Sequence, residues 1–391
     1  VSGHTVTCSN SGSITNKGSA TNTLSSVVIK SGTTDVSGNY SITKLNGTLT
    51  VNARATTCTS GSSSRAYNGS ALTNTTGGSC TNLVSGHSAT FSGHKGTITN
   101  VGSVANTFGS VAIKNSGGAD ISGNYTIATA NGTLTVTRAK TATTGSCINP
   151  TYNGSGQALA SGASNASYSN NSRTESGSQT VTVTAGSNYA FSDGQTSKTL
   201  SCSIGKRATT CTSGSSSRAY NGSALTNTTG GSCTNLVSGH SATFSGHKGT
   251  ITNVGSVANT FGSVVIKSGT TDVSGNYSIT KANGTLTVNK VNATCPTTTA
   301  YSGNFNNAGH SIGVSGGSGG TIQYSTDNSN WSATNPSRTN GGTQTTYVRV
   351  VGDSNHNTVS CGSATITIKN VTVTTTFNPN GAILTSQSQS N

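Results

Sequence analysis

The sequence predicts an all-β fold of several small, disulfide-stapled sandwiches in a linear array, and three observations lead to this prediction. The 391 residues are 30% hydrophobic, 5% aromatic and 7% charged, which is too little apolar material for one large core. The chain has no Met and one Glu but abundant Thr, Ser, Asn and Gly, which favours strands and turns over helices. Its nine cysteines stand at recurring positions, which is not typical of a disordered chain.

Internal repeats divide the chain into units. Residues 55–140 and 208–290 are nearly the same sequence, and residues 1–54 carry only the second half of that unit. The complete units have 67 to 86 residues, the size of an Ig-like sandwich. The predicted domains are a partial Ig-like repeat (1–54), an Ig-like repeat (55–140), a divergent repeat (141–207), a near copy of the second domain (208–290), a second divergent repeat (291–370), and a donor strand or start of a next repeat (371–391).

Within a repeat, apolar residues alternate with Thr, which predicts half-buried strands. The inward-facing residues of one predicted strand pair are Tyr125, Ile127, Leu134 and Val136, with equivalents at Tyr40, Ile42, Leu49 and Val51 and at Tyr277, Ile279, Leu286 and Val288. Asn131-Gly132 lies between the two strands, and this dipeptide predicts a hairpin turn.

The cysteines indicate an oxidising, extracellular location, because they do not form the close C-x-x-C pairs of zinc or redox sites. We expect disulfides within units, each worth about 2–4 kcal/mol, between Cys58 and Cys80, Cys147 and Cys202, Cys211 and Cys233, and Cys295 and Cys361. Cys8 is left over and aligns with Phe91 and Phe244, so a buried free thiol is favoured slightly over an intermolecular bridge. No secretion signal or apolar stretch of membrane-spanning length is present, and the chain reads as a processed or excised piece of a secreted or cell-surface protein.

The motif D-[VI]-S-G-N-Y-x-I followed by N-G-T-L-T-V occurs at residues 35–51, 120–136 and 272–288. It resembles the MBG-type repeats of bacterial cell-surface adhesins and fibre proteins, and residues 321–336 and 347–357 resemble the bacterial Ig-like repeats that accompany them. The resemblance implies a surface-exposed spacer or adhesive stalk, and it brings no catalytic residues. The high cysteine content departs from most such repeats.

The two ends of the chain suggest an assembly mode. The tail TFNPNGAILTS matches TYNGSGQALAS, the opening strand of the unit 141–207, and this is the strand that residues 1–54 lack. We therefore expect residues 371–391 to add a strand to the half-repeat of a neighbouring copy, with candidate assembly residues Phe377, Ala382, Ile383 and Leu384. The alternative is that the chain is one period of a longer covalent array, and either arrangement gives a linear fibre.

The formal net charge of +14 does not predict nucleic-acid binding, because 21 Lys and Arg are sparse in a chain of this length and no aromatic RNA-binding cluster accompanies them. Many of these cations stand at the predicted domain junctions, namely Arg54, Arg138, Lys140, Lys206, Arg207, Lys290 and Lys369. They either keep the junctions soluble and deter sideways strand pairing or bind an anionic cell-wall polymer or polysaccharide, and the first interpretation is favoured.

A glycan-binding adhesin is the alternative function, with Trp331, Tyr324 and Tyr347 as candidate stacking residues. A sole Trp in a sandwich more often fills the core, so the structural interpretation is preferred. Catalytic and metal sites are not predicted: Gly309 to Gly313 fit G-x-S-x-G without a following helix, and the recurrent His87 and His240 suit loops better than a metal site. We expect neither a cofactor nor enzymatic activity.

Overall fold

The computed structural model describes residues 1–377 and 383–388, and their regular structure is almost entirely β. The helical segments among these residues are three 3-10 turns, η1(Ser37–Asn39), η2(Ser122–Asn124) and η3(Ser274–Asn276). The prediction of an all-β, disulfide-stapled chain is therefore confirmed. No helix in the described ranges has the length and apolar character needed to cross a membrane.

The chain forms two compact units. The first comprises residues 1–149, 158–173 and 178–203, and the second comprises residues 150–157, 174–177 and 204–391. The segment 141–207 thus contributes residues to both units, and each unit is described by itself.

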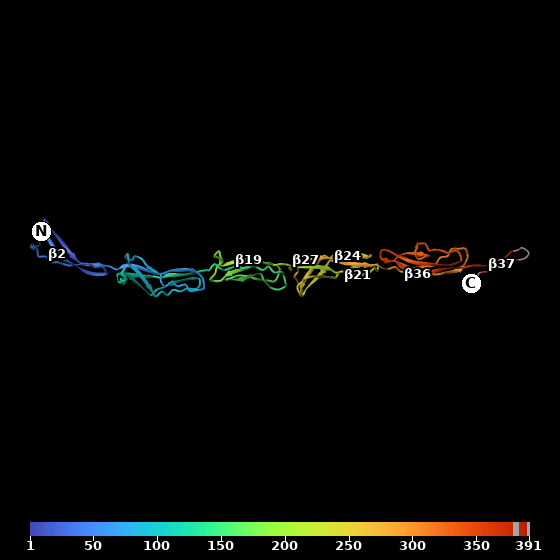
Figure 1. Cartoon of the computed structure of the whole chain (residues 1–391), viewed down its shortest axis with the longest axis horizontal. Coiled ribbons are helices and arrows are strands. Elements are labelled where there is room, and N and C mark those ends of the chain that lie inside the picture. Colours follow the sequence, from blue (N-terminus) through green and yellow to red (C-terminus); the bar gives the residue numbers. More distant parts are fainter. Residues whose placement is uncertain (378–382, 389–391) are drawn as a thin grey trace. The chain divides into compact units, whose positions relative to one another are not determined.

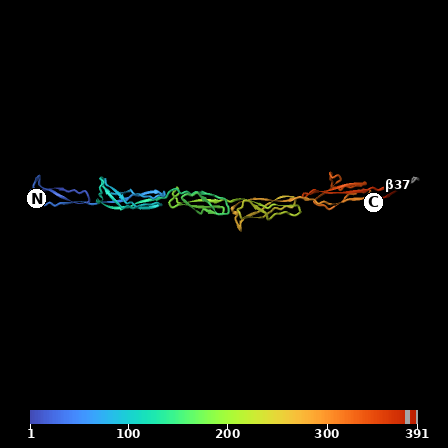
Figure 2. The same ribbon diagram turned by 60° about the horizontal axis from the view of Figure 1, so that its bottom comes forward.

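The first unit begins with the half-repeat, residues 1–54, which forms an open, four-stranded arrangement around one long strand. The strands are β1(His4–Ser11), β2(Gly18–Ser31), β3(Thr34–Asp35) and β4(Gly47–Val51). The other three strands all pair antiparallel with β2, β1 and β3 at its C-terminal part and β4 at its N-terminal part. In Figure 1 and in the turned view of Figure 2, this blue segment is a thin ribbon next to the thicker first full repeat.

The first full repeat, residues 55–140, contains two three-stranded sheets and a strand pair. Its strands are β5(Arg54–Ser60), β6(Ser63–Ala66), β7(Gly78–Cys80), β8(Ser88–Ser92), β9(Gly102–Asn106), β10(Ser110–Lys114), β11(Tyr125–Ala130) and β12(Gly132–Thr137). Strand β5 lies between β11, to which it is parallel, and β7. Strand β12 lies between β6, to which it is parallel, and β9, while β8 pairs with β10. In both three-stranded sheets, a strand from the start of the repeat (β5 or β6) thus pairs with a strand from its end (β11 or β12).

The predicted hairpin at Asn131-Gly132 is wrong. Strands β11 and β12 belong to different sheets and do not pair with each other. The chain passes from one sheet to the other at this dipeptide, alongside the bend between β5 and β6. A Cβ on Gly132 would collide with the backbone of Ser60 and Gly61. Glycine is required here by this close approach of two backbones and not by a tight turn.

The segment 141–207 contains β13(Ser146–Cys147), β14(Gln157–Ala158), β15(Ala160–Ser161), β16(Ala166–Ser169), β17(Ser172–Arg173), β18(Gly177–Ala185) and β19(Ser197–Ile204). Strand β18 is central, between β16 and β19. The core of this part of the first unit contains Ala142, Val183, Ala185 and Phe191, with Tyr168 and Leu200 packed against them.

The second unit contains the second full repeat, residues 208–290, which has the strand order of the first with one further short strand, β26, paired with β25. Its strands are β20(Arg207–Ser213), β21(Ser216–Ala219), β22(Gly231–Cys233), β23(His240–Ser245), β24(Gly255–Asn259), β25(Ser263–Ser268), β26(Thr271–Asp272), β27(Tyr277–Ala282) and β28(Gly284–Asn289). Its core contains Leu225, Leu286 and Val288, as that of the first full repeat contains Leu72, Leu134 and Val136.

The rest of the second unit, from residue 291, is built on the four-stranded sheet β31-β36-β34-β33. Its strands are β29(Val291–Asn292), β30(Thr297–Thr299), β31(Tyr301–Asn304), β32(Gly313–Ser315), β33(Gly320–Ser325), β34(Gly342–Gly352), β35(His356–Asn357) and β36(Val359–Lys369). Ile312, Val348, Ile366 and Ile368 form the core. The tail then forms a separate antiparallel pair, β37(Thr372–Phe377) with β38(Ile383–Ser388).

Candidate assembly interfaces

Four disulfides join the eight paired cysteines, within units: Cys58–Cys80, Cys147–Cys202, Cys211–Cys233 and Cys295–Cys361. In each full repeat the bridge links directly opposite residues of neighbouring antiparallel strands, with Cα atoms 4.0 Å apart. The bridge therefore fastens the short strand β7 or β22 to a sheet that it could hardly join by its few backbone hydrogen bonds.

Cys8 is free and exposed, so the expectation of a buried thiol is wrong. Its equivalent Phe91 packs on Phe108, with ring centroids 5.2 Å apart, and lies directly over Gly78 of β7. Residues 1–54 contain no equivalent of β7, because they correspond only to the second half of the repeat. Cys8 therefore lacks the contact with β7 that its equivalent Phe91 makes in the full repeat.

The half-repeat exposes apolar positions that the full repeats bury. Leu134 and Val136 are 0% and 2% exposed, whereas their equivalents Leu49 and Val51 are only half-buried. In the first full repeat these side chains are covered by Tyr67 and Leu72, which come from its first half. Their equivalents do not occur in residues 1–54, so Leu49 and Val51 line an incomplete core.

The backbone of the half-repeat is incomplete at the same place. Strand β12 has neighbours on both sides, β9 and β6, whereas within the part of the chain that the structure describes β4 is hydrogen-bonded only to β2. Beside β12, Leu72 also exchanges two backbone hydrogen bonds with Ile98, of 2.7 and 3.1 Å. The equivalent of Ile98 in the half-repeat is Ile14. An open strand edge next to an uncovered apolar face is the arrangement to which an added strand binds.

The predicted assembly segment lies partly outside the described residues. Phe377 ends β37 and Ile383 and Leu384 begin β38, whereas Ala382 falls outside the described residues. Among the described residues, the two strands pair with each other and with no other strand. An isolated two-stranded hairpin is marginally stable in water, so this tail has unpaired edges to offer to another sheet.

A recurrent pair of hydrogen bonds, which we call the asparagine clasp, joins successive repeats. In the first unit, the Lys17 N–H donates to Asn124 Oδ1 (2.8 Å) and Asn124 Nδ2 donates to Asn16 Oδ1 (3.0 Å). The same pattern joins the next pair of segments: the Val101 N–H donates to Asn188 Oδ1 and Asn188 Nδ2 donates to Asn100 Oδ1, both at 2.9 Å. One carboxamide is thus hydrogen-bonded to two consecutive residues of the preceding repeat.

The second unit contains two further clasps. The Val254 N–H donates to Asn355 Oδ1 (2.8 Å), and Asn355 Nδ2 donates to Asn253 Oδ1 (3.2 Å). At the other junction the Ser176 N–H donates to Asn276 Oδ1 (2.7 Å), and Asn276 Nδ2 donates to the carboxylate of Glu175. A glutamate therefore replaces asparagine as the acceptor without loss of the pattern.

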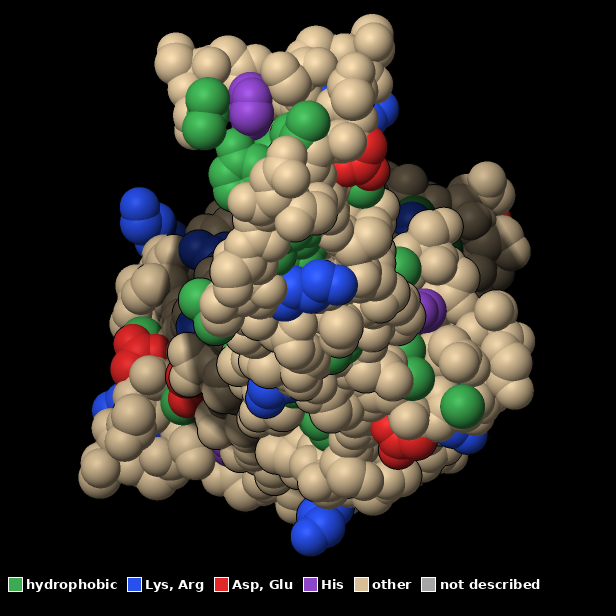
Figure 3. All heavy atoms as spheres, turned by 90° about the vertical axis from the view of Figure 1, so that its left-hand side faces the viewer, with side chains coloured by type: hydrophobic (Ala, Val, Ile, Leu, Met, Phe, Trp, Pro, Cys, Tyr) green, Lys and Arg blue, Asp and Glu red, His purple; other side chains and the backbone are tan. Residues whose placement is uncertain are grey.

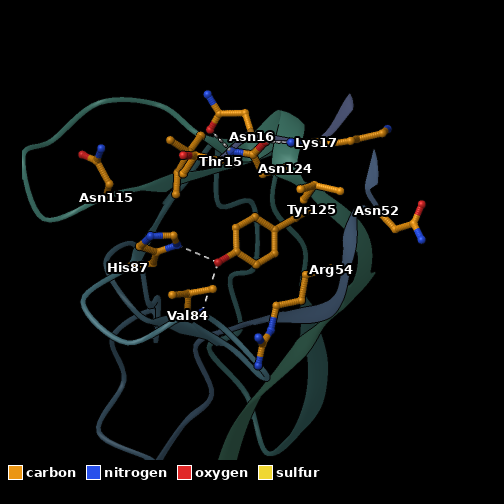
Figure 4. A pocket seen from close by; sticks show the side chains of 12 residues that line it. Thr15, Asn16, Lys17, Asn52, Arg54, Val84, His87, Asn115, Asn124 and Tyr125 are labelled. Atoms are coloured by element: carbon orange, nitrogen blue, oxygen red, sulfur yellow. Dashed lines mark hydrogen bonds between the residues drawn. The ribbon is translucent and has the colours of Figure 1, made fainter. Parts of the chain in front are cut away.

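The clasp between the half-repeat and the first full repeat borders a cavity of about 390 Å³. Figure 4 shows Asn16, Lys17 and Asn124 along one side and the Tyr125 ring between them and His87. The Tyr125 hydroxyl lies 2.6 Å from His87 Nδ1 and accepts a hydrogen bond from the Val84 N–H. Because Asn124, Tyr125 and His87 already have hydrogen-bond partners within the protein and the cavity lies at a repeat junction, it indicates incomplete packing of the half-repeat more than a ligand site.

Two of the three aromatic residues predicted as a glycan platform, Tyr324 and Tyr347, face opposite sides of the sheet. Tyr324 packs against the core beside Val348, its partner across the sheet. Tyr347 follows in the alternation and faces the other side. Trp331 does not fill the core either: the Arg349 guanidinium lies over its ring at 4.4 Å from the centroid. Tyr324 therefore does not share a stacking surface with Tyr347.

Three of the seven predicted junction cations, Arg54, Arg207 and Lys290, make internal hydrogen bonds. Arg54 donates to the backbone carbonyl and to Oδ1 of Asn82, both at 2.8 Å, and Arg207 does the same with Asn235. Lys290 Nζ donates to the carbonyl of Asp353 at 3.3 Å. Figure 3 shows Lys and Arg side chains singly and not as one patch on the face displayed. These contacts favour the structural interpretation of the cations.

The histidines and the G-x-S-x-G segment also have structural partners. His87 and His240 each contact a tyrosine hydroxyl, and His94 and His247 contact backbone carbonyls at 3.0 Å. Within the described residues, no group of three His, Cys, Asp or Glu side chains is placed to hold a metal ion. Strand β32, and not a helix, follows Ser311.

Sequence reasoning missed the clasp residues, although a signal was present. Asn39, Asn124 and Asn276 belong to the repeated S-G-N-Y motif, which was interpreted only as a family signature. The preceding Asp explains the local geometry: Asp120 accepts the Ser122 N–H at 2.9 Å and so orders the 3-10 turn that ends at Asn124. A search of protein-family models finds no match for this chain, and a search of curated proteins finds none either.

Proposed function

We propose that this chain is a structural subunit of an extracellular fibre or surface stalk. Copies follow one another head to tail, and the C-terminal segment 371–391 of one copy completes the half-repeat of the next. The observation that carries the proposal is the open half-repeat, in which Leu49, Val51 and the edge of β4 lack the cover that the first half of a repeat provides elsewhere.

The sequence equivalence gives each tail residue a definite place in the half-repeat. In the first full repeat, Tyr67 and Leu72 cover the core, and the Tyr67 N–H donates to the Thr137 carbonyl at 2.8 Å. The sequence match pairs Phe377 with Tyr152 and Leu384 with Leu159, which are 2% and 0% exposed in segment 141–207, and so assigns the tail residues the covering role that Tyr67 and Leu72 have in the full repeat. The two tail residues would bury apolar surface against Leu49 and Val51, and the tail backbone would pair with β4 and with Ile14.

The extracellular assignment is supported by four disulfides, which persist in oxidising compartments. The resemblance to MBG-type surface repeats agrees with it. The role is one of spacing and mechanical continuity, and it assigns no catalytic residue.

The test is assembly of the full chain, measured by sedimentation velocity over a range of concentrations. We expect Leu384→Asp to abolish or strongly weaken assembly, because a carboxylate would enter the apolar core of the half-repeat. Ser388→Asp places the same charge at the end of β38 and is the matched control. Equal assembly of both variants and the wild type would contradict the proposal.

A second measurement distinguishes strand addition from a covalent array. Fibres dissociated in denaturant with a reducing agent should give a single species of 38.7 kDa if strands are exchanged. A ladder of multiples that survives denaturation would show that the repeats are joined by peptide or other covalent bonds.

A glycan- or wall-polymer-binding adhesin has weaker support. Trp331 is covered on one side by Arg349, and Tyr324 packs into the core. Arg54 and Arg207 make internal contacts. If this function were correct, Trp331→Ala should abolish retention on immobilised glycans while the thermal stability of the chain is unchanged.

A further inference from the structure

The half-repeat carries a clasp turn that is already formed. The turn η1 ends at Asn39, and Val36 before it has φ −118° and ψ 16°. The corresponding residue in the first full repeat, Ile121, has φ −124° and ψ 18°, and Val273 in the second has φ −118° and ψ 13°. Asn39 therefore stands in the conformation in which Asn124 and Asn276 bind a preceding repeat.

The segment 291–370 carries the other side of a clasp. Each residue that donates its N–H to a clasp is followed by a glycine with positive φ: Gly18 (146°), Gly102 (150°), Gly255 (147°) and Gly177 (122°). Gly341 is followed in the same way by Gly342, with φ 116°. Asn340 then occupies the place of Glu175, just before the donor. Asn340 is exposed.

An aromatic residue accompanies the clasp at the complete junctions. The Tyr152 ring meets the Tyr277 ring edge to face, with centroids 5.6 Å apart, and Tyr67 and Tyr220 make the same kind of contact with Tyr189 and His356. In segment 291–370 the equivalent is Phe305, whose N–H donates to the Lys369 carbonyl as the Tyr152 N–H donates to that of Gly205. Phe305 is 37% exposed, whereas Tyr152 is 2% exposed.

The three 3-10 turns that end at a motif asparagine differ in exposure. Asn276, which follows a complete segment, is 5% exposed. Asn124, which follows the half-repeat, is half-buried, and Asn39 is exposed. Of the flanking residues, Val273 is buried, whereas Ile121 and Val36 are half-buried. Asn39 and Phe305 are thus the two halves of a junction that is not formed within the described chain.

We propose that these two surfaces bind each other between copies, through a fifth asparagine clasp. The Gly341 N–H of one copy donates to Asn39 Oδ1 of the next, and Asn39 Nδ2 donates to Asn340 Oδ1. Phe305 packs edge to face on Tyr40, which already pairs with His4 as Tyr277 pairs with His240. This inference rests on the proposed head-to-tail assembly and adds a second interface, distinct from the strand supplied by residues 371–391.

The test uses the full chain and the dissociation constant for assembly, measured by sedimentation velocity. Asn39→Leu and Phe305→Ala should each weaken assembly by about tenfold or more. The first leaves the Gly341 N–H and Asn340 Oδ1 without their partner, and the second removes the ring that packs on Tyr40. Phe305→Tyr and Asn340→Glu are the matched controls, because tyrosine and glutamate occupy these places at other junctions. Both controls should assemble like the wild type.

Unchanged assembly of Asn39→Leu and Phe305→Ala, together with loss of assembly in Leu384→Asp, would overturn the clasp and leave strand addition standing. If the wild type does not assemble, the proposed strand exchange fails, and the clasp is tested in two copies fused head to tail in one polypeptide. Amide exchange at Gly341 of the first copy should then be slower than in the single chain. Equal exchange rates would overturn the clasp in that case as well.

Discussion

The half-repeat and the first full repeat have closely similar sequences over their common part but differ in burial. Ile29 in the half-repeat is 9% exposed and its equivalent Ile113 is 0% exposed, so the antiparallel ladder that holds both is preserved. Leu49, by contrast, is half-buried where Leu134 is fully buried. The difference shows which part of the fold depends on nearby sequence and which depends on strands from the other half of the repeat.

The same comparison explains a missing strand. Tyr125–Ala130 forms β11, whereas residues 41–46 form no strand. Strand β11 is paired only with β5, and the half-repeat has no strand in that place. Leu45 is consequently 81% exposed, at the position where the full repeats carry Ala130 and Ala282. A sequence with strong β propensity therefore needs its neighbour before it becomes a strand.

The largest expected difference is the cost of truncating the equivalent leucines. Leu134→Ala should reduce the free energy of unfolding of its repeat by about 2–5 kcal/mol, because it leaves a cavity in a closed core. Leu49→Ala should cost about 1 kcal/mol or less in a single copy, because that side chain is partly in water. Amide exchange of β12 and β4 would report the two costs separately. Equal costs would mean that the half-repeat is covered in the single chain.

The disulfide provides a second contrast of somewhat smaller size. Replacing Cys58 and Cys80 by serine should destabilise the first full repeat by about 3 kcal/mol, because the bridge closes a loop of 22 residues. Exchange of β5 and β7 amides should increase, whereas the half-repeat, which has no disulfide, should be unaffected. The second full repeat with Cys211–Cys233 intact serves as an internal control. Faster exchange there too would contradict a local effect.

A buried asparagine gives the third contrast. Asn106 is 0% exposed, and its Nδ2 donates to the carbonyls of Gly61 and Asn74, both at 2.9 Å. Asn106→Ala should cost about 1–3 kcal/mol, because it leaves these carbonyls without their donor. Asn22→Ala, at the equivalent place in the half-repeat, should cost about 0.5 kcal/mol or less, because Asn22 is only half-buried. A similar cost for both, from amide exchange of β9 and β2, would contradict this contrast.

Composition and alternation were sufficient to predict the all-β class, because Thr-rich strands with apolar residues at every second position have few other ways to bury them. Strand pairing was not predictable in the same way. Asn131-Gly132 has the local signature of a hairpin, but the parallel partners of β11 and β12 come from about 70 residues earlier in the chain. The clasp also depends on such distant segments, and nothing in the local pattern of Asn124 shows that it binds Asn16 and Lys17.

The smallest expected effect is a pH dependence that should not distinguish the two regions. Hydrogen bonds from the Ser37 side chain and N–H lower the pKa of Asp35 below its usual value, and Ser122 does the same for Asp120. A carboxylate with a lowered pKa stabilises its turn above the ordinary pKa, and this stabilisation is lost as the pH falls through the lowered value. Both turns should therefore loosen only at a pH below the ordinary pKa of Asp, which carboxyl chemical shifts would follow. A normal pKa for Asp35 beside a lowered one for Asp120 would show that the turn of the half-repeat forms only when a preceding copy binds it.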